Sequence, residues 1–142
     1  MTMTWNIASK IVRKVVTIDG HHSVLDAATL MANEFVGSVV ITDSSRIIGI
    51  FTERDLMMRV VGKKIDPEVV RINDVMTKDV VTVTPKDSAL TCLNLMKTHR
   101  CRHLLVFDGD EFIGIVSLRD MVALMMEEKE QLIAYLHQYI SS

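Results

Sequence analysis

A chain of 142 residues is long enough for one compact domain, or for two small units sharing a core, but too short for two independent domains. A formal net charge of -2, with both signs scattered along the chain, argues against binding along a nucleic acid, and no apolar run is long enough to span a bilayer. We therefore expect a soluble, cytoplasmic globular protein with a single core and with neither nucleic-acid nor membrane partners.

The first elements predicted along the chain are a short strand over residues 15–18 and a helix over residues 23–35. Ser23 stands where an N-cap is expected, and apolar residues up to Phe35 recur at helical spacing. Two short apolar runs follow, at residues 38–41 and 47–51.

The turn-forming residues Asp43, Ser44 and Ser45 separate those two runs, which we interpret as paired strands. A second helix is predicted to begin at Thr52, with Leu56, Met57 and Val60 on its buried side. The order of elements is therefore β-α-β-β-α.

A polar stretch at residues 64–70 is predicted to be a linker, and residues 71–77 a short helical lead-in to a second set of elements. That set has strands at residues 80–83, 103–107 and 112–116, and helices at 88–98 and from Ser117. The chain then stays helical to its end, where one apolar stripe comprises Met125, Leu132, Ile133, Leu136 and Ile140. We expect this projecting helix to help form a homodimer; the alternative is that it folds back on its own subunit.

The two sets are copies of one another. Residues 14–60 align with residues 79–125 without a gap, and identical pairs run from Val15/Val80 to Asp55/Asp120. Duplication predicts an α/β (α+β) fold of two tandem β-α-β-β-α repeats, packed about a pseudo-twofold axis with a cleft at their junction. The predicted organisation is repeat one with its lead-in at 1–63, the linker at 64–70, repeat two at 71–126 and the C-terminal helix at 127–142.

Each copy carries the motif Gly-Ile-x-(Thr or Ser)-x-Arg-Asp at a strand-to-helix corner, at residues 49–55 and 114–120. A helix N-terminus stabilises a phosphate, and the hydroxyl of Thr52 or Ser117 can donate to it. The carboxylate of Asp55 or Asp120, one turn into the helix, can accept two hydrogen bonds from a ribose.

The same four-residue spacing is also a capping box, in which the hydroxyl and the carboxylate satisfy backbone N–H groups of the first helical turn. Both interpretations stay open from the sequence. Cys92 and Cys101 lie in no Cys-x-x-Cys pair and are expected to be structural thiols. No nucleophile–base pair, metal-ligand set or phosphate-binding loop stands at a recognisable spacing, so we expect neither catalysis nor a metal.

The repeat length, the order of elements and the corner motifs closely resemble tandem CBS domains, over nearly the whole chain. The resemblance implies a non-catalytic regulatory module, commonly dimeric, that binds an adenosine-containing ligand: AMP, ADP or ATP, in some members NAD or S-adenosylmethionine. It needs no other cofactor and implies a regulated partner protein.

Position by position, the resemblance implies that Asp55 and Asp120 bind ribose, and that Thr52 and Ser117 meet phosphate. It places Thr17 and Thr82 beside the base, and residues 99–104 match a stretch whose cations approach phosphates. The full set of expected ligand-binding residues is Thr17, Thr52, Arg54, Asp55, Thr82, Arg102, His103, Ser117, Arg119 and Asp120.

The copies differ at that basic stretch. Copy one has Gly37 and Ser38 where copy two has Arg102 and His103, and no cation lies in residues 34–39. Equal occupancy of two ligand sites is therefore not expected, because only Arg102 can form a charge-assisted contact. The competing function is a structural dimerisation module whose corners are only helix caps.

Overall fold

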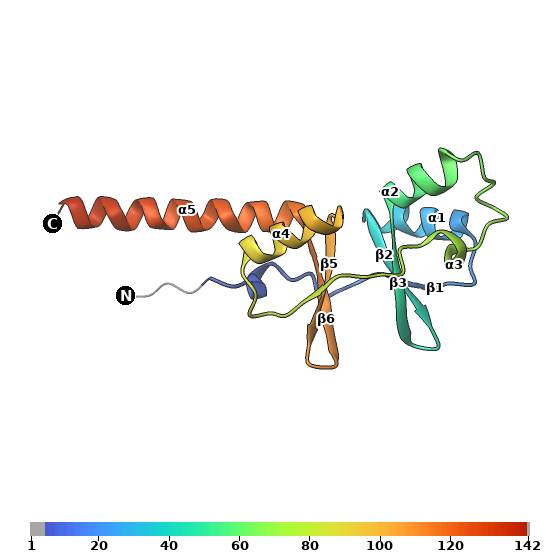
Figure 1. Cartoon of the computed structure of the whole chain (residues 1–142), viewed down its shortest axis with the longest axis horizontal. Helices are drawn as coiled ribbons and strands as arrows, with labels where there is room; N and C mark the ends of the chain where they lie inside the picture. The colour runs from blue at the N-terminus through green and yellow to red at the C-terminus, as the bar shows by residue number, and fades with distance from the viewer. Residues whose placement is uncertain (1–4, 142) are drawn as a thin grey trace. The chain divides into compact units, whose positions relative to one another are not determined.

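The computed structural model describes residues 5–141, which form two compact units. The copy-one unit is Lys14–Val80, and the copy-two unit joins the first residues of the chain, up to Arg13, to Val81–Ser142. Each unit contains one three-stranded sheet with helices against it (Figure 1). The α/β fold of two tandem repeats is confirmed.

In the copy-one unit the sheet order is β1-β2-β3, with β1 parallel to β2 and β2 antiparallel to β3. The elements are β1 (Thr17–Asp19), α1 (Val24–Glu34), β2 (Ser38–Asp43), β3 (Arg46–Thr52), α2 (Glu53–Asp55), the π-helical segment η2 (Leu56–Val61) and α3 (Ile72–Val75).

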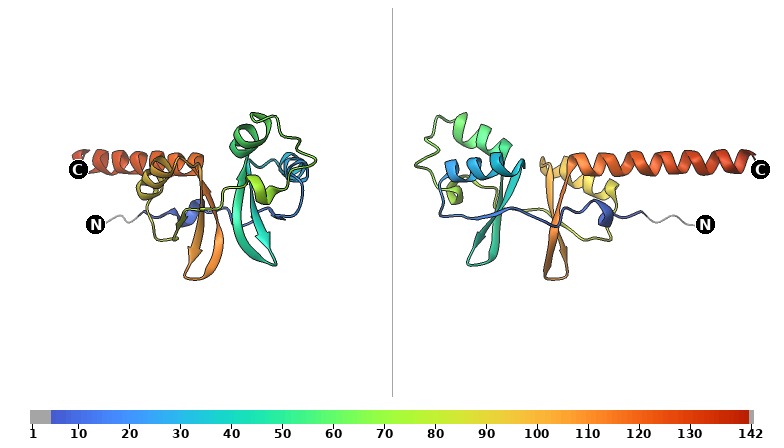
Figure 2. Two further views of the ribbon diagram at one scale, coloured as in Figure 1. Left: turned by 45° about the vertical axis from the view of Figure 1, so that its right-hand side comes forward. Right: turned by 180° about the vertical axis from the view of Figure 1, so that it is seen from behind.

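The copy-two unit repeats this topology with the sheet order β4-β5-β6. Its elements are the 3-10 helix η1 (Ile7–Lys10), β4 (Thr82–Val83), α4 (Ala89–His99), β5 (His103–Asp108), β6 (Glu111–Ser117) and α5 (Leu118–Ser141). In each unit the long hairpin carries its tight turn at the end away from the helices (Figure 2).

Local sequence signals explain these boundaries. The Ser23 hydroxyl accepts a hydrogen bond from the Asp26 N–H, which confirms the predicted N-cap, and the aligned Ser88 hydroxyl accepts one from the Thr91 N–H in the same way. The predicted hairpin turn is confirmed too: Ser44 and Ser45 have φ of 50° and 68°, the left-handed values that a two-residue hairpin turn requires.

Some predicted core positions are wrong, Phe35, Met57 and Val122 among them. Phe35 is 95% exposed because it is the left-handed C-cap of α1, with φ 55°, and so lies beyond the helical stripe. Met57 is 59% exposed because residues 56–61 form π turns, in which the Gly62 N–H bonds to the Met57 carbonyl at 2.7 Å. The wider turn changes the face on which Met57 lies.

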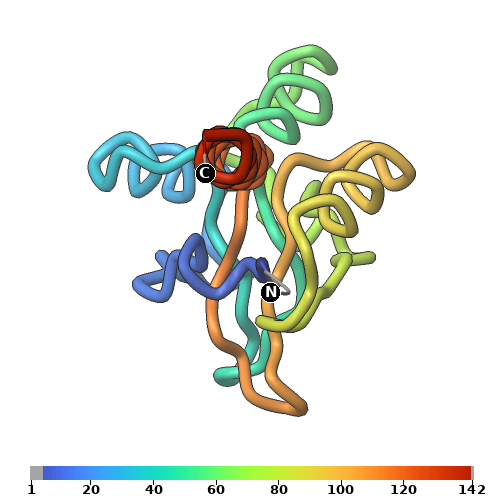
Figure 3. The backbone as a smooth tube through the Cα atoms, turned by 90° about the vertical axis from the view of Figure 1, so that its left-hand side faces the viewer, coloured from blue at the N-terminus to red at the C-terminus, as the bar shows by residue number. Residues whose placement is uncertain are grey.

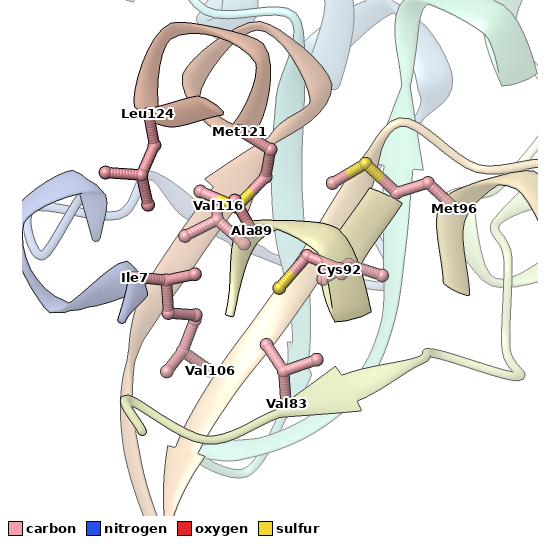
Figure 4. Close-up of a cluster of buried hydrophobic side chains, with 10 residues drawn as sticks. Ile7, Val83, Ala89, Cys92, Met96, Val106, Val116, Met121 and Leu124 are labelled. Atoms are coloured by element: carbon pink, nitrogen blue, oxygen red, sulfur yellow. The ribbon is translucent and has the colours of Figure 1, made fainter. Parts of the chain in front are cut away.

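The buried residues form two clusters, one per unit, where the sequence predicted one core. Ile7, from the N-terminal lead-in, is fully buried in the copy-two core, where Figure 4 shows it among the side chains of α4, α5 and the sheet. Ile72, at the aligned position, is fully buried in the copy-one core. Each unit is therefore completed by the lead-in that precedes the other copy in sequence.

The C-terminal helix is continuous with the last helix of copy two, forming α5, which Figure 3 shows end-on, down the helix axis. Its outer part carries exposed apolar side chains, namely Met126, Leu132, Ile133, Tyr135, Leu136, Tyr139 and Ile140. Within residues 5–141, no helix combines the length and apolar character needed to cross a membrane.

Candidate functional site

The glycine that opens each corner motif allows the backbone of a lead-in to approach the backbone of the strand closely. Thr77 pairs with Ile50 through two backbone hydrogen bonds, of 2.9 and 3.0 Å, and Val12 pairs with Ile115 in the same way. A Cβ on Gly49 would lie 2.7 Å from the Thr77 carbonyl oxygen, and one on Gly114 would lie 2.3 Å from that of Val12. Each motif therefore lies where three segments meet: a lead-in, the strand that ends at the corner (β3 or β6), and the helix that follows it.

At the copy-one corner, Thr52 and Asp55 form a complete capping box. The Thr52 hydroxyl accepts from the Asp55 N–H at 3.2 Å, and Asp55 Oδ2 accepts from the Thr52 N–H at 3.0 Å. Oδ2 also accepts from the Thr52 hydroxyl at 3.2 Å. The capping alternative that the sequence left open is thus realised here.

Two further groups engage the same carboxylate. Thr77 donates its hydroxyl proton to Asp55 Oδ1 at 3.2 Å, and Arg59 Nε lies 3.6 Å from that oxygen. The Arg59 guanidinium also donates to the carbonyls of Val75 and Met76, at 3.2 and 2.9 Å. Asp55 is only 7% exposed. Through these contacts its carboxylate joins α2, η2 and the end of α3.

The copy-two corner repeats the cap without the additional donors. The Ser117 hydroxyl accepts from the Asp120 N–H at 3.2 Å and donates to Asp120 Oδ2 at 2.9 Å. The Ser117 N–H reaches the same oxygen at 3.4 Å. Val12 and Leu124 stand where copy one has Thr77 and Arg59, and neither side chain can donate. Oδ1 of Asp120 therefore keeps its acceptor capacity for a ligand or solvent.

The structure brings Arg102 and His103 to this second corner. The Leu118 N–H, at the start of α5, donates to the Arg102 carbonyl at 2.8 Å, and His103 pairs with Ser117 across β5 and β6. Arg102 itself is exposed. The backbone of Arg102 and His103 thus lies beside Ser117 and Asp120 within one unit.

In copy one, a negatively charged side chain lies over Gly37, the residue that aligns with Arg102. The Glu53 N–H donates to the Gly37 carbonyl at 3.0 Å, and the Glu53 carboxylate lies over Gly37, since a Cβ there would be 3.2 Å from Glu53 Oε1. The copy-one corner therefore has a second carboxylate, that of Glu53, over the backbone position where copy two has Arg102.

Of the remaining predicted residues, the two threonines lie away from the corners of their own units and the two arginines lie in the corner motifs. Thr17 begins β1 and Thr82 begins β4, each on the strand at the opposite edge of the sheet from the corner, and both are exposed. Arg54 and Arg119 are exposed on their helices, and Arg54 Nε contacts Met58 Sδ at 3.2 Å.

The cysteines are poor nucleophiles in this setting. Burial raises the pKa of the Cys92 thiol to about 11, with a smaller contribution from the charge of Asp87, and burial also raises the pKa of Cys101. Within residues 5–141, no cluster of three or more His, Cys, Asp or Glu side chains is arranged to hold a metal ion.

Thr77 and Arg59 were missed from the sequence. The signal that could have found them is the alignment of the copies, because Thr77 aligns with Val12 and Arg59 with Leu124 while the neighbouring motif residues are preserved. A polar residue that differs between otherwise matching copies indicates a role that only one copy has.

Comparison with known proteins adds a family match. The CBS domain model matches residues 8–62 and 72–127. The arabinose 5-phosphate isomerase KdsD of Yersinia pestis is 39% identical over 110 residues, which are 77% of this chain and 33% of that protein. The chain spans 33%, 60% and 23% of the lengths of three curated relatives that it matches.

Solved structures share both fold and sequence with the chain. A CBS-domain protein from Burkholderia ambifaria MC40-6 has a TM-score of 0.75 at 38% identity, covering 78% of this chain and 81% of that one. The hexameric CBS-CP12 protein from bloom-forming cyanobacteria has a TM-score of 0.77 at 27% identity, covering 85% of this chain and 68% of that one.

Proposed function

This chain belongs to the CBS domain family, whose tandem members are generally regulatory modules, and from that premise we propose that it binds an adenine nucleotide and catalyses no reaction. The ligand class is AMP, ADP or ATP, with NAD and S-adenosylmethionine as further candidates. The supporting observation is the copy-two corner, where Ser117, Asp120 and the Arg102 backbone meet at the start of a 24-residue helix.

Each part of that corner suits a part of the ligand. The N-terminus of α5 and the positive charge of Arg102 favour a phosphate. Asp120 can accept hydrogen bonds from the two ribose hydroxyls. Thr17 and Thr82 stay proposed as the residues beside the base, as do Arg54 and Arg119 as ligand contacts.

Ligand binding would rearrange one proton. The Ser117 hydroxyl has a single proton, which is directed at Asp120 Oδ2 in this structure. Donation to a phosphate requires that hydroxyl to rotate, and the rotation releases Oδ2 for the ribose. The Ser117 oxygen can keep accepting from the Asp120 N–H, so the helix cap persists.

Titration calorimetry with AMP, ADP, ATP, NAD and S-adenosylmethionine, on protein freed of bound nucleotide, tests this function. We expect saturable heat with at least one of these compounds. The absence of heat from all five at millimolar concentration would refute nucleotide binding and leave a structural module.

The alternative function, a structural dimerisation module, has its own supporting observation. The exposed apolar residues of α5 would be covered by a second copy of the chain, and the hexameric cyanobacterial relative shows that similar proteins assemble. We propose a homodimer whether or not a nucleotide binds. Light scattering measures the molar mass of the full chain and of a variant in which Leu132 and Leu136 are both changed to Ser. A wild type that is monomeric would contradict the homodimer.

A further inference from the structure

The two corner carboxylates have different hydrogen-bonding capacity. A carboxylate offers about four acceptor positions. For Asp55, hydrogen bonds from the Thr52 N–H, the Thr52 hydroxyl and the Thr77 hydroxyl occupy three of them, and Arg59 Nε forms an ion pair with Oδ1 at 3.6 Å. For Asp120, the hydrogen bonds that its carboxylate accepts among residues 5–141 come from the Ser117 N–H and hydroxyl, and both reach Oδ2.

The donors around Asp55 are themselves committed to structure. Arg59 donates to the last carbonyls of the lead-in helix α3, and Thr77 is fixed by its two backbone bonds to Ile50. A ribose that approached Asp55 would have to displace one of these groups and leave it without its charged partner. Such a displacement costs binding energy.

Charge reinforces the difference. The Glu53 carboxylate over Gly37 repels an anionic ligand tail at the copy-one corner, and the aligned residues in copy two are Leu118 and Arg102. Both effects disfavour the first corner and favour the second.

We infer that Asp55, Thr77 and Arg59 form a structural clasp that closes the copy-one corner, so that each chain binds one nucleotide, at the Asp120 corner. The clasp holds residues 72–77 on the copy-one sheet. The stoichiometry rests on the proposed function, whereas the clasp itself does not.

The matched variants Asp55→Asn and Asp120→Asn test the inference in the full chain. Asparagine keeps the shape of the side chain but presents an amide NH2 to donors, so Asp55→Asn should lower Tm by roughly 5–10 °C. Asp120→Asn should change Tm by less than about 3 °C. Calorimetry with AMP, ADP and ATP should give one site per wild-type chain, retained in Asp55→Asn and weakened about tenfold or more in Asp120→Asn.

If Asp55→Asn does not fold, Arg59→Leu serves in its place, since leucine is the residue that copy two has. It should lower Tm while one nucleotide per chain still binds. Two equivalent sites in the wild type, or loss of binding in Asp55→Asn with binding kept in Asp120→Asn, overturns the inference.

The proposed function can fail separately. If the wild type binds none of the three nucleotides, nucleotide sensing fails, and the Tm comparison alone decides the clasp. A larger loss in Asp55→Asn than in Asp120→Asn then supports the clasp, and equal losses overturn it.

Discussion

The Thr77 hydroxyl donates to Asp55 Oδ1 at 3.2 Å, which links the lead-in after α3 to the buried carboxylate of the copy-one corner. The aligned residue, Val12, makes the same backbone bridge to β6 but has no donor for Asp120. The Thr77 hydroxyl is therefore one of the groups that distinguish two corners whose backbone pairing is the same.

Thr77→Val should lower the free energy of unfolding by about 1–2 kcal/mol, because it removes a hydrogen bond to a charged, buried acceptor. Urea denaturation followed by circular dichroism measures the change. Thr17→Val, at an exposed strand position, is the matched control and should cost less than about 0.5 kcal/mol. Equal effects of the two substitutions would show that the Thr77 contact contributes nothing.

Gly114→Ala should destabilise the copy-two unit by about 2 kcal/mol or more, because the new Cβ would overlap the Val12 carbonyl oxygen, and backbone cannot move away as a side chain can. Gly37→Ala is the control: its Cβ would meet only the flexible Glu53 side chain, at 3.2 Å. Chemical denaturation of both variants compares them. A Gly114→Ala protein as stable as Gly37→Ala would contradict the close approach of the lead-in.

Ile7→Ala should cost about 2–4 kcal/mol, since Ile7 is fully buried in the copy-two core. Amide hydrogen exchange should locate the loss in β5, at residues 104–106, rather than in β2, at residues 39–41. The control is Ile65→Ala, at a position that is 39% exposed, which should cost far less. Faster exchange confined to β2 would show that the N-terminal lead-in packs on the copy-one unit and would contradict this prediction.

Stability should fall as pH rises from about 9 to about 11, because folding raises the pKa of Cys92 from 9.0 to about 11. As pH rises, the Cys92 thiol ionises in the unfolded chain before it ionises in the folded chain. The contribution of the buried, neutral thiol to the free energy of unfolding is therefore complete below pH 9 and disappears as pH passes through the folded pKa. Thermal unfolding of wild type and Cys92→Ala between pH 7 and 11 measures it. Identical pH slopes for the two proteins would contradict a buried, neutral thiol.

The sequence predicted the duplication, the order of elements and the caps well, because these depend on local chemistry. Ser23 and Ser88 cap helices as their spacing indicated, and the turn predicted at residues 43–45 is present, with Ser44 and Ser45 in a left-handed conformation that serine seldom adopts. Phe35 was misplaced because the helical stripe does not reveal where a helix ends in a left-handed cap.

The partner of each lead-in could not be predicted in the same way. A segment as short as residues 71–77 shows by its pattern that it is helical, but not which sheet it covers. Gly49 and Gly114 were the available signal, since a glycine kept in both copies within a strand indicates a close backbone approach. The clasp around Asp55 was hidden for a related reason: its donors, Thr77 and Arg59, come from outside the motif.

The most direct test of the central claim is an NMR titration of 15N-labelled protein with ATP, following the backbone amides of residues 117–120 and 52–55. The account predicts large, saturable shifts at the Ser117–Asp120 corner and small ones at the Thr52–Asp55 corner. Shifts of equal size at both corners, or none at either, would contradict it.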